Sequence, residues 1–121
     1  MEMELTEPTP AHDAPVEADG FCNIASAVDE SAQREPFKPA IFYPEGRNAS
    51  GRVRYSHYTF RQLIEASDAI ARGLGQVGIT RGMRTVLMVR PSLEFFALTF
   101  ALFRAGVVQI FVDPGMGWRN L

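Results

Sequence analysis

The sequence predicts an α/β fold whose second half is a strand–helix–strand unit of a parallel sheet. Residues 85–89 are continuously apolar and rich in β-formers, and residues 107–112 are apolar except for Gln109, a pattern typical of buried strands. The segment between them, 93–105, is apolar on nearly every side and follows Pro91 and Ser92, which favours a buried helix. Because short joints connect these elements, we expect a right-handed crossover between parallel strands.

The first half predicts a helix followed by a β-hairpin. Asn23 is a suitable N-cap for a helix over residues 24–34, and prolines after this segment end the helix. Residues 40–43 form an apolar strand, and a polar, glycine-bearing loop over 44–51 leads to residues 52–56, where apolar and polar side chains alternate. Two such strands joined by such a loop indicate a hairpin with one face exposed to water.

A capping box marks the start of the longest predicted helix. Thr59 stands three residues before Gln62, so its hydroxyl can accept from the Gln62 N–H while the Gln62 amide reaches back. Apolar side chains then recur with helical spacing until Gly78, which ends the helix as a left-handed residue. Glu65 and Asp68 lie on the polar side beside arginines, and solvated ion pairs explain them better than an acid–base pair.

The charge distribution separates an acidic tail from the rest of the chain. Residues 1–20 hold six of the 14 acidic residues, three prolines and no Lys or Arg, so we expect a disordered tail at 1–20 and a folded region at 21–121. The positive surplus of the folded region is scattered, which argues against nucleic-acid binding. The chain start lacks a signal-peptide core, and the single Cys22 excludes a disulfide framework, so we expect a cytoplasmic setting.

The apolar stretch 93–112 is long enough to span a membrane, but its composition argues against this. Glu94, Arg104 and Gln109 interrupt the stretch. A central arginine costs about 2.5–3.5 kcal/mol on insertion, whereas a buried helix followed by a buried strand carries no such cost. We therefore expect no membrane-spanning segment.

Reactive side chains form no catalytic constellation in this sequence. Lys38 is the only lysine, so a catalytic lysine in this chain would have to be Lys38. His12 and His57 lack a second metal ligand at suitable spacing, and Cys22 has no nearby histidine to activate it. We predict no catalytic, cofactor-binding or metal-binding residue in the chain.

Two loops are the places where a ligand would be expected to bind. In open α/β sheets ligands gather beyond the carboxyl ends of the strands, which singles out residues 90–92 and 113–117. Gly115 and Gly117 in the second loop lack the other residues of a phosphate-binding motif, so turn geometry explains them.

Several segments resemble the adenylate-forming ligase superfamily of acyl-CoA synthetases, luciferases and peptide-synthetase adenylation domains. YTFRQL at 58–63 resembles the early Leu-Thr-Tyr-x-Glu-Leu core of that family. LFRAG at 102–106, continuing to Val-Asp-Pro at 112–114, resembles the second core, in which Lys-Ala-Gly precedes a strand ending in Pro-x-Asp. Residues 84–96 with 113–117 are most similar to the long-chain branch that includes olefin-pathway β-lactone synthetases.

The resemblance implies that residues 21–121 are the N-terminal portion of an AMP-binding, acyl-adenylating domain, and hence an incomplete fold. The phosphate loop with its lysine, the ribose-binding aspartate and the catalytic lysine of such ligases would lie beyond Leu121. ATP and Mg²⁺ are then cofactors of the parent enzyme, and none is expected for this chain. Gln109 and Phe111 depart from the family pattern, which has a proline just before the Asp-bearing turn.

Two functions stay open at the level of sequence. The resemblance implies a parent acid–thiol or other acyl-adenylating ligase that activates a fatty or β-hydroxy acid. This chain would then be an inactive scaffold whose partner is the missing C-terminal remainder. The alternative is a stand-alone interaction module that associates, with itself or with a partner, through the apolar helix 93–105. Whether the chain is itself an enzyme is not decided by its sequence.

Overall fold

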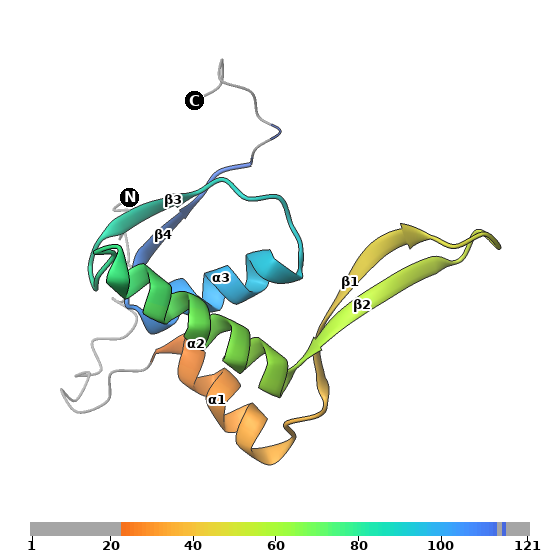
Figure 1. Cartoon of the computed structure of the whole chain (residues 1–121), viewed down its shortest axis with the longest axis horizontal. Coiled ribbons are helices and arrows are strands. Elements are labelled where there is room, and N and C mark those ends of the chain that lie inside the picture. Colours follow the sequence, from red (N-terminus) through yellow and green to blue (C-terminus); the bar gives the residue numbers. More distant parts are fainter. Residues whose placement is uncertain (1–22, 114, 116–121) are drawn as a thin grey trace, which may run out of the picture.

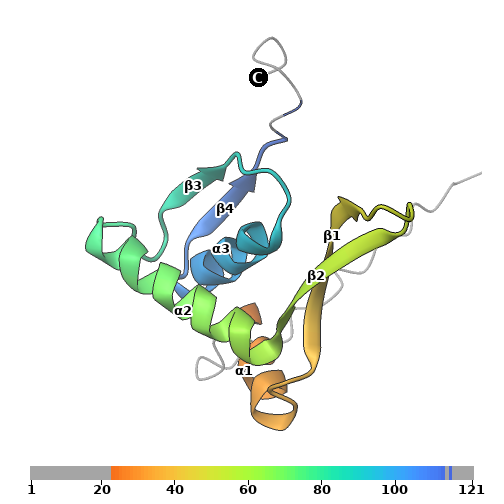
Figure 2. The same ribbon diagram turned by 45° about the vertical axis from the view of Figure 1, so that its right-hand side comes forward.

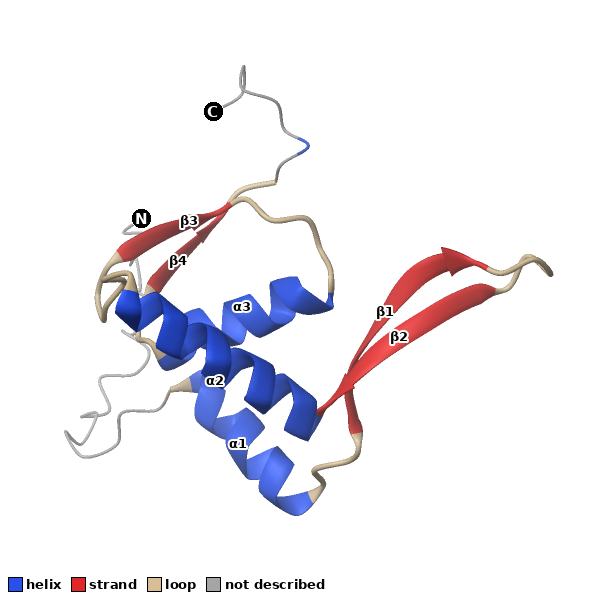
Figure 3. Cartoon of the chain, in the orientation of Figure 1, coloured by secondary structure: helices blue, strands red, loops and turns tan. Residues whose placement is uncertain are grey.

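The computed structural model describes residues 23–113 and 115, so the predicted tail at 1–20 and most of the loop 113–117 lie outside the described residues. The chain forms α1 (Ile24–Arg34), β1 (Pro39–Arg47), β2 (Val53–Thr59), α2 (Phe60–Gln76), β3 (Arg84–Leu87), α3 (Leu93–Arg104) and β4 (Val108–Phe111). Figure 1 shows α2 packed between α1 and α3, with the β3–β4 pair beside α3. The predicted α/β class is confirmed, as the helix and strand colours of Figure 3 make plain.

The helices begin where the sequence predicts, because each is capped by a side chain. Asn23 accepts a hydrogen bond in the first turn of α1. The capping box of α2 is complete: the Gln62 N–H donates to Thr59 Oγ1 over 3.2 Å, and the Thr59 N–H donates to Gln62 Oε1 over 2.9 Å. Ser92 Oγ accepts from the Phe95 N–H over 3.1 Å at the start of α3. These caps satisfy donors that a helix cannot pair internally.

The β1–β2 hairpin projects away from the helices, as Figure 1 and Figure 2 both show. The predicted loop at 44–51 is too long, because β1 continues to Arg47 opposite Val53. An irregularity in the register between Pro44 and Arg47 contains Gly46, whose φ of 97° favours glycine. Val53 and Tyr55 are exposed, so the alternation at 52–56 does not mark a buried face within the described residues.

The β3 and β4 strands pair in parallel, from Arg84 opposite Val108 to Leu87 opposite Phe111. This register confirms the predicted strand–helix–strand unit. Both strands are shorter than the apolar runs 85–89 and 107–112. One further bond, from the Val112 N–H to the Leu87 carbonyl, continues the pairing, and the chain then runs from β3 through residues 88–91 to the α3 cap at Ser92.

One face of the β3–β4 sheet is covered and the other is open. Leu87 and Val107 are buried with Leu102 of α3. Val86, Val108 and Ile110, which alternate with the covered positions, expose 55%, 50% and 42% of their surface. The apolar pattern of these strands is typical of cover on both faces, but among the described residues only one face is covered. We call the open side, Val86, Val108 and Ile110, the outer face.

Gly106 closes the turn between α3 and β4, and alanine at this position is expected to destabilise the chain. Its φ is 70°, and an added Cβ would lie 2.9 Å from Cγ of Arg81. We expect Gly106→Ala to lower the free energy of unfolding by about 1–3 kcal/mol, measured by urea denaturation. Gly73→Ala is the matched control. Gly73 lies in α2 with open space at its Cβ, so alanine there should stabilise by about 0.5–1 kcal/mol. Equal effects at the two sites would contradict the argument.

No helix among residues 23–113 and 115 has both the length and the apolar character that a bilayer span requires.

Candidate functional site

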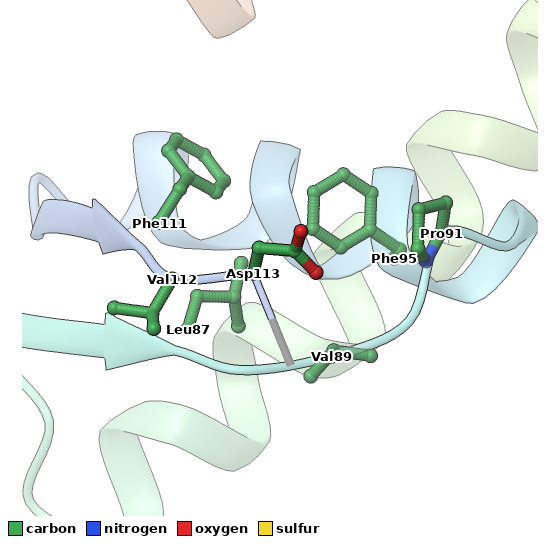
Figure 4. A pocket seen from close by; sticks show the side chains of 7 residues that line it. All are labelled: Leu87, Val89, Pro91, Phe95, Phe111, Val112 and Asp113. Atoms are coloured by element: carbon green, nitrogen blue, oxygen red, sulfur yellow. The ribbon is translucent and has the colours of Figure 1, made fainter. Parts of the chain in front are cut away.

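An apolar pocket lies at the carboxyl ends of β3 and β4, where the sequence places its two candidate loops. The pocket has a volume of about 440 Å³ and is lined by Leu87, Val89, Pro91, Phe95, Phe111, Val112 and Asp113. Figure 4 shows the side chains of Phe95, Phe111 and Asp113 along this pocket, and the centroids of the two rings lie 5.9 Å apart. The position of the pocket thus agrees with the rule that ligands gather at strand ends, whereas its aromatic walls were not predicted.

Backbone pairing holds the pocket loops in place. The Val112 N–H donates to the Leu87 carbonyl over 3.1 Å, so the chain after β4 stays beside the end of β3. Asp113 Oδ1 accepts from the Gly115 N–H over 2.8 Å, which fixes the side chain across its own turn. The other carboxylate oxygen keeps acceptor capacity toward the pocket.

The pocket does not fit ATP or Mg²⁺. Among its described lining residues, Asp113 is the only ionisable one, and the other side chains are apolar. A triphosphate needs cationic or N–H donors, and Mg²⁺ binds through carboxylates together with substrate phosphates. Such a lining suits an apolar group beside a hydrogen-bond donor better than a nucleotide. Within residues 23–113 and 115, no three His, Cys, Asp or Glu side chains are grouped to hold a metal ion.

Of the reactive residues considered in the sequence, the two that the structure describes, Lys38 and His57, do not line this pocket. Lys38 lies outside it, exposed and paired with Glu35 over 2.9 Å. His57 lies on the hairpin, with its ring 5.7 Å from that of Phe42. His12 and Cys22 lie outside the described residues.

Gln109 occupies the covered side of β4 with only half of its amide paired. Its Nε2 donates to the Thr99 carbonyl of α3 over 3.0 Å. Its Oε1 is buried and has no hydrogen-bond partner among the described residues. The departure from the family pattern at this position therefore introduces a polar contact between β4 and α3, together with an unsatisfied acceptor.

A cluster of polar side chains that was not predicted from the sequence connects the three helices. The Arg104 guanidinium, in the last turn of α3, forms two hydrogen bonds to the Asp29 carboxylate of α1, through Nη1 over 3.2 Å and through Nη2. Nη1 also lies 3.3 Å from Asp68 Oδ1 of α2, and Nε donates to Ser67 Oγ over 3.1 Å. We call these four residues the Arg104 cluster. Because Asp29, Asp68 and Ser67 each contact the Arg104 guanidinium, the cluster connects the three helices and has a structural role.

Both acidic residues of α2 form ion pairs and stay in contact with water, as expected. Glu65 pairs with Arg61 over 2.8 Å. Asp68, whose side chain is 45% exposed, pairs with Arg104 of α3, a partner that was not predicted from the sequence. The available signal was an arginine at the end of an otherwise apolar helix, because a partly buried guanidinium requires carboxylate partners.

The fold is that of the N-terminal part of adenylate-forming ligases. The solved N-terminal subdomain of Klebsiella oxytoca NpsA superposes with a TM-score of 0.68 at 23% identity, covering 80% of this chain and 23% of that one. A fatty acyl-adenylate ligase from L. pneumophila superposes with a TM-score of 0.64 at 22% identity, over 77% of this chain and 16% of that one. At these identities the likeness establishes the fold alone.

Comparison of the sequence with protein families identifies the family of this chain. Residues 28–121 match the family model described as AMP-binding enzyme. The chain belongs to the AMP-binding enzyme family, whose members in general use ATP and Mg²⁺.

Two relatives share about half of the aligned residues with this chain. This chain is 50% identical over 102 residues to an olefin β-lactone synthetase of Xanthomonas campestris pv. campestris, and the alignment covers 84% of this chain. It is also 49% identical over 102 residues to an olefin β-lactone synthetase of Stenotrophomonas maltophilia, and that alignment covers 83% of this chain. The chain spans 18% of the length of each relative.

Proposed function

We propose that the chain is the N-terminal part of a ligase that activates a fatty or β-hydroxy acid with ATP, forming an acyl-adenylate and releasing pyrophosphate. The observation that supports this most directly is the 50% identity over 102 residues to an olefin β-lactone synthetase. A β-lactone forms when a β-hydroxyl attacks the activated carboxyl of the same molecule. A β-hydroxy acid is therefore the substrate class that such a product requires.

In this proposal residues 21–121 act as scaffold, and the chain by itself does not catalyse adenylation. Charge develops on the α-phosphate during adenylation, and its stabilisation requires donors and a metal ion. The pocket at the strand ends, lined by one carboxylate and otherwise by apolar side chains, supplies neither. The partner of the chain is the rest of a ligase, and the proposed setting is the cytoplasm.

The isolated chain is expected to release no pyrophosphate from ATP in the presence of fatty or 3-hydroxy fatty acids. A chimera tests its role as scaffold. In the Xanthomonas synthetase, the 102 aligned residues are replaced by those of this chain. We expect kcat/KM for 3-hydroxy acids to fall no more than roughly tenfold, equivalent to about 1.4 kcal/mol of transition-state stabilisation.

The control for this experiment is the same synthetase without the aligned segment, which should be inactive. Pyrophosphate release by the isolated chain would contradict the proposed inactivity. A folded chimera that activates neither fatty nor 3-hydroxy acids would contradict the proposed substrate class.

The alternative function, association through α3, gains no support from burial. Ala97, Ala101 and Leu102 are fully buried, and the aromatic side chains of α3 are at least partly covered. The exposed apolar side chains next to this helix belong to the sheet instead.

A further inference from the structure

The edge of β2 that faces away from β1 is unpaired among the described residues, since the hairpin is a two-stranded sheet. Figure 1 and Figure 2 show the hairpin projecting beyond the helices. An unpaired strand edge presents a row of N–H and C=O groups that another strand can bond. β1 contains Pro39 and Pro44, which lack a backbone N–H and are typical of strands that stay at the edge of a sheet. The edge of β2, a strand without proline, is therefore the one suited to accept a further strand.

Basic and apolar side chains alternate along the start of β2. The Asn48 N–H donates to the Arg52 carbonyl over 2.9 Å, so the pairing of the hairpin extends to Arg52, just before Val53, Arg54 and Tyr55. Consecutive side chains point to opposite faces of a strand, so the two arginines share one face and the two apolar residues share the other. All four residues are exposed, and neither arginine forms an ion pair among the described residues. An incoming strand matches this edge if acidic and apolar residues alternate along it.

Residues 1–5 carry that complementary pattern. They read Met-Glu-Met-Glu-Leu, with acidic side chains at the even positions and apolar side chains at the odd positions. Strict alternation over such a length is the pattern of a strand with two unlike faces. The prolines within residues 1–20 are Pro8, Pro10 and Pro15, so none of them interrupts this segment.

We infer that residues 1–5 add to the open edge of β2 as a third strand, which places their two glutamates beside the two arginines of that edge. Met3 then lies opposite Val53, and the exposed apolar face of the hairpin gains apolar neighbours. The match holds whether the segment runs parallel or antiparallel to β2, because the glutamates flank Met3 symmetrically. A slip of one residue would bring the glutamates to the apolar face, so the alternation also sets the register.

The chain between the segment and α1 is long enough for this contact. Residues 6–22 can span up to about 55 Å when extended. The combined length of α1, with 11 residues, and β2, with 7 residues, is about 40 Å. The segment can therefore reach β2 of its own chain.

Other occupants fit this edge less well. Residues 16–19 also alternate between apolar and acidic, but the few residues between them and α1 span only about 14 Å, less than the length of α1 itself. A second copy that pairs its own β2 about Val53 would place arginines opposite arginines, and like charges directly opposite each other are destabilising.

Hydrogen exchange of the 121-residue chain provides the first experiment. Deletion of residues 2–5 is expected to accelerate exchange at least about tenfold at those amides of residues 53–57 that do not bond to β1, because they lose their partners. The control is deletion of residues 11–14, which removes equally many residues outside the segment and should change these rates by less than about twofold. Unchanged exchange after deletion of residues 2–5 overturns the inference.

A charge exchange tests the proposed pairing directly. Replacing Glu2 and Glu4 together by arginine should accelerate exchange in β2 about threefold or more, because like charges then face each other. Adding Arg52→Glu and Arg54→Glu to that variant should restore the natural rates to within about twofold. Failure of the second pair of substitutions to restore protection overturns the inference.

Two further variants separate a specific strand from general attraction between charges. Glu7→Arg with Asp13→Arg makes the same change of net charge outside the segment and should leave exchange in β2 unchanged. Met3→Glu with Glu4→Met keeps the composition but breaks the alternation, so it should lose as much protection as the deletion. Equal protection in this last variant and in the natural chain would contradict a paired strand.

Concentration and the chimera test the remaining occupants. Protection of β2 that rises with protein concentration would assign the edge to a second copy and overturn the inference. The inference does not rest on the proposed function, because the segment and the edge both belong to this chain. In a chimera that also carries residues 1–20, deletion of residues 2–5 should again accelerate exchange in β2. Equal protection with and without residues 2–5 would assign the edge to the remainder of the ligase and overturn the inference.

Discussion

Replacing Arg104 by leucine is expected to lower the free energy of unfolding by about 2–4 kcal/mol, measured by urea denaturation of the isolated chain. The Arg104 side chain is only 17% exposed and binds side chains from both other helices. Its loss would leave the Asp29 and Asp68 carboxylates close together without a cation, and the buried Ser67 hydroxyl without its donor. The estimate lies below that for a fully buried pair because both aspartates keep contact with water.

Lysine at position 104 separates the role of charge from that of geometry. A lysine keeps the positive charge but cannot form the two-point contact with Asp29 while also bonding to Ser67. We therefore expect Arg104→Lys to cost about 1–2 kcal/mol, roughly half the effect of leucine. The control is Arg61→Leu, which removes an exposed ion pair with Glu65 and should change stability by less than about 1 kcal/mol. An Arg104→Leu chain as stable as the control would show that the cluster does not hold the helices together.

Local signals were sufficient to predict the helices. The side chains of Asn23, Thr59 and Ser92 act within four residues of their own position, so each cap could be recognised from the sequence alone. The parallel pairing of β3 and β4 followed from the short joints around an apolar helix, since such a crossover has few alternatives. The pocket at the ends of these strands followed from the same topology.

Contacts between residues far apart in the chain could not be predicted from such local signals. Arg104 meets partners 75 and 37 residues away in the chain, and nothing in the spacing of charges identifies Asp29 or Ser67 as those partners. The exposed outer face had a different cause. The apolar run around Val86 is typical of a strand that is buried on both sides. Among the described residues, no element covers one of those sides. An apolar sequence can therefore predict a strand correctly, although one face of that strand is exposed among the described residues.

The Arg104 cluster and the apolar core around Leu102 both hold α3 in position. Arg104 ties the last turn of α3 to α1 and α2, while Leu102, two residues earlier, fills the space between α3 and the sheet. The position of α3 in turn sets Phe95 at the wall of the pocket. Changes that loosen α3 should therefore be detected both in stability and at the pocket.

Replacing Leu102 by alanine is expected to lower the free energy of unfolding by about 2–5 kcal/mol. Leu102 is 1% exposed and forms one cluster with Leu87 and Val107, against which side chains from α2 and α3 also pack. The substitution removes apolar contacts between α3, α2 and the β3–β4 pair. Because that pair is short, its few hydrogen bonds compensate little for the lost contacts. The control is Val77→Ala at a site that is 74% exposed, which should change stability by less than about 0.5 kcal/mol.

The size of the Leu102→Ala effect also tests whether this core depends on the rest of a ligase. If the remainder covers the outer face, the sheet in the chimera is held from both sides, and α3 has less freedom to move into the cavity. The chimera should then lose a similar free energy but retain its hydrogen-exchange protection in β4, whereas the isolated chain should lose protection there. Equal loss of β4 protection in both proteins would show that the remainder adds no support to this sheet, because the same cavity would then open the strands whether or not the outer face is covered.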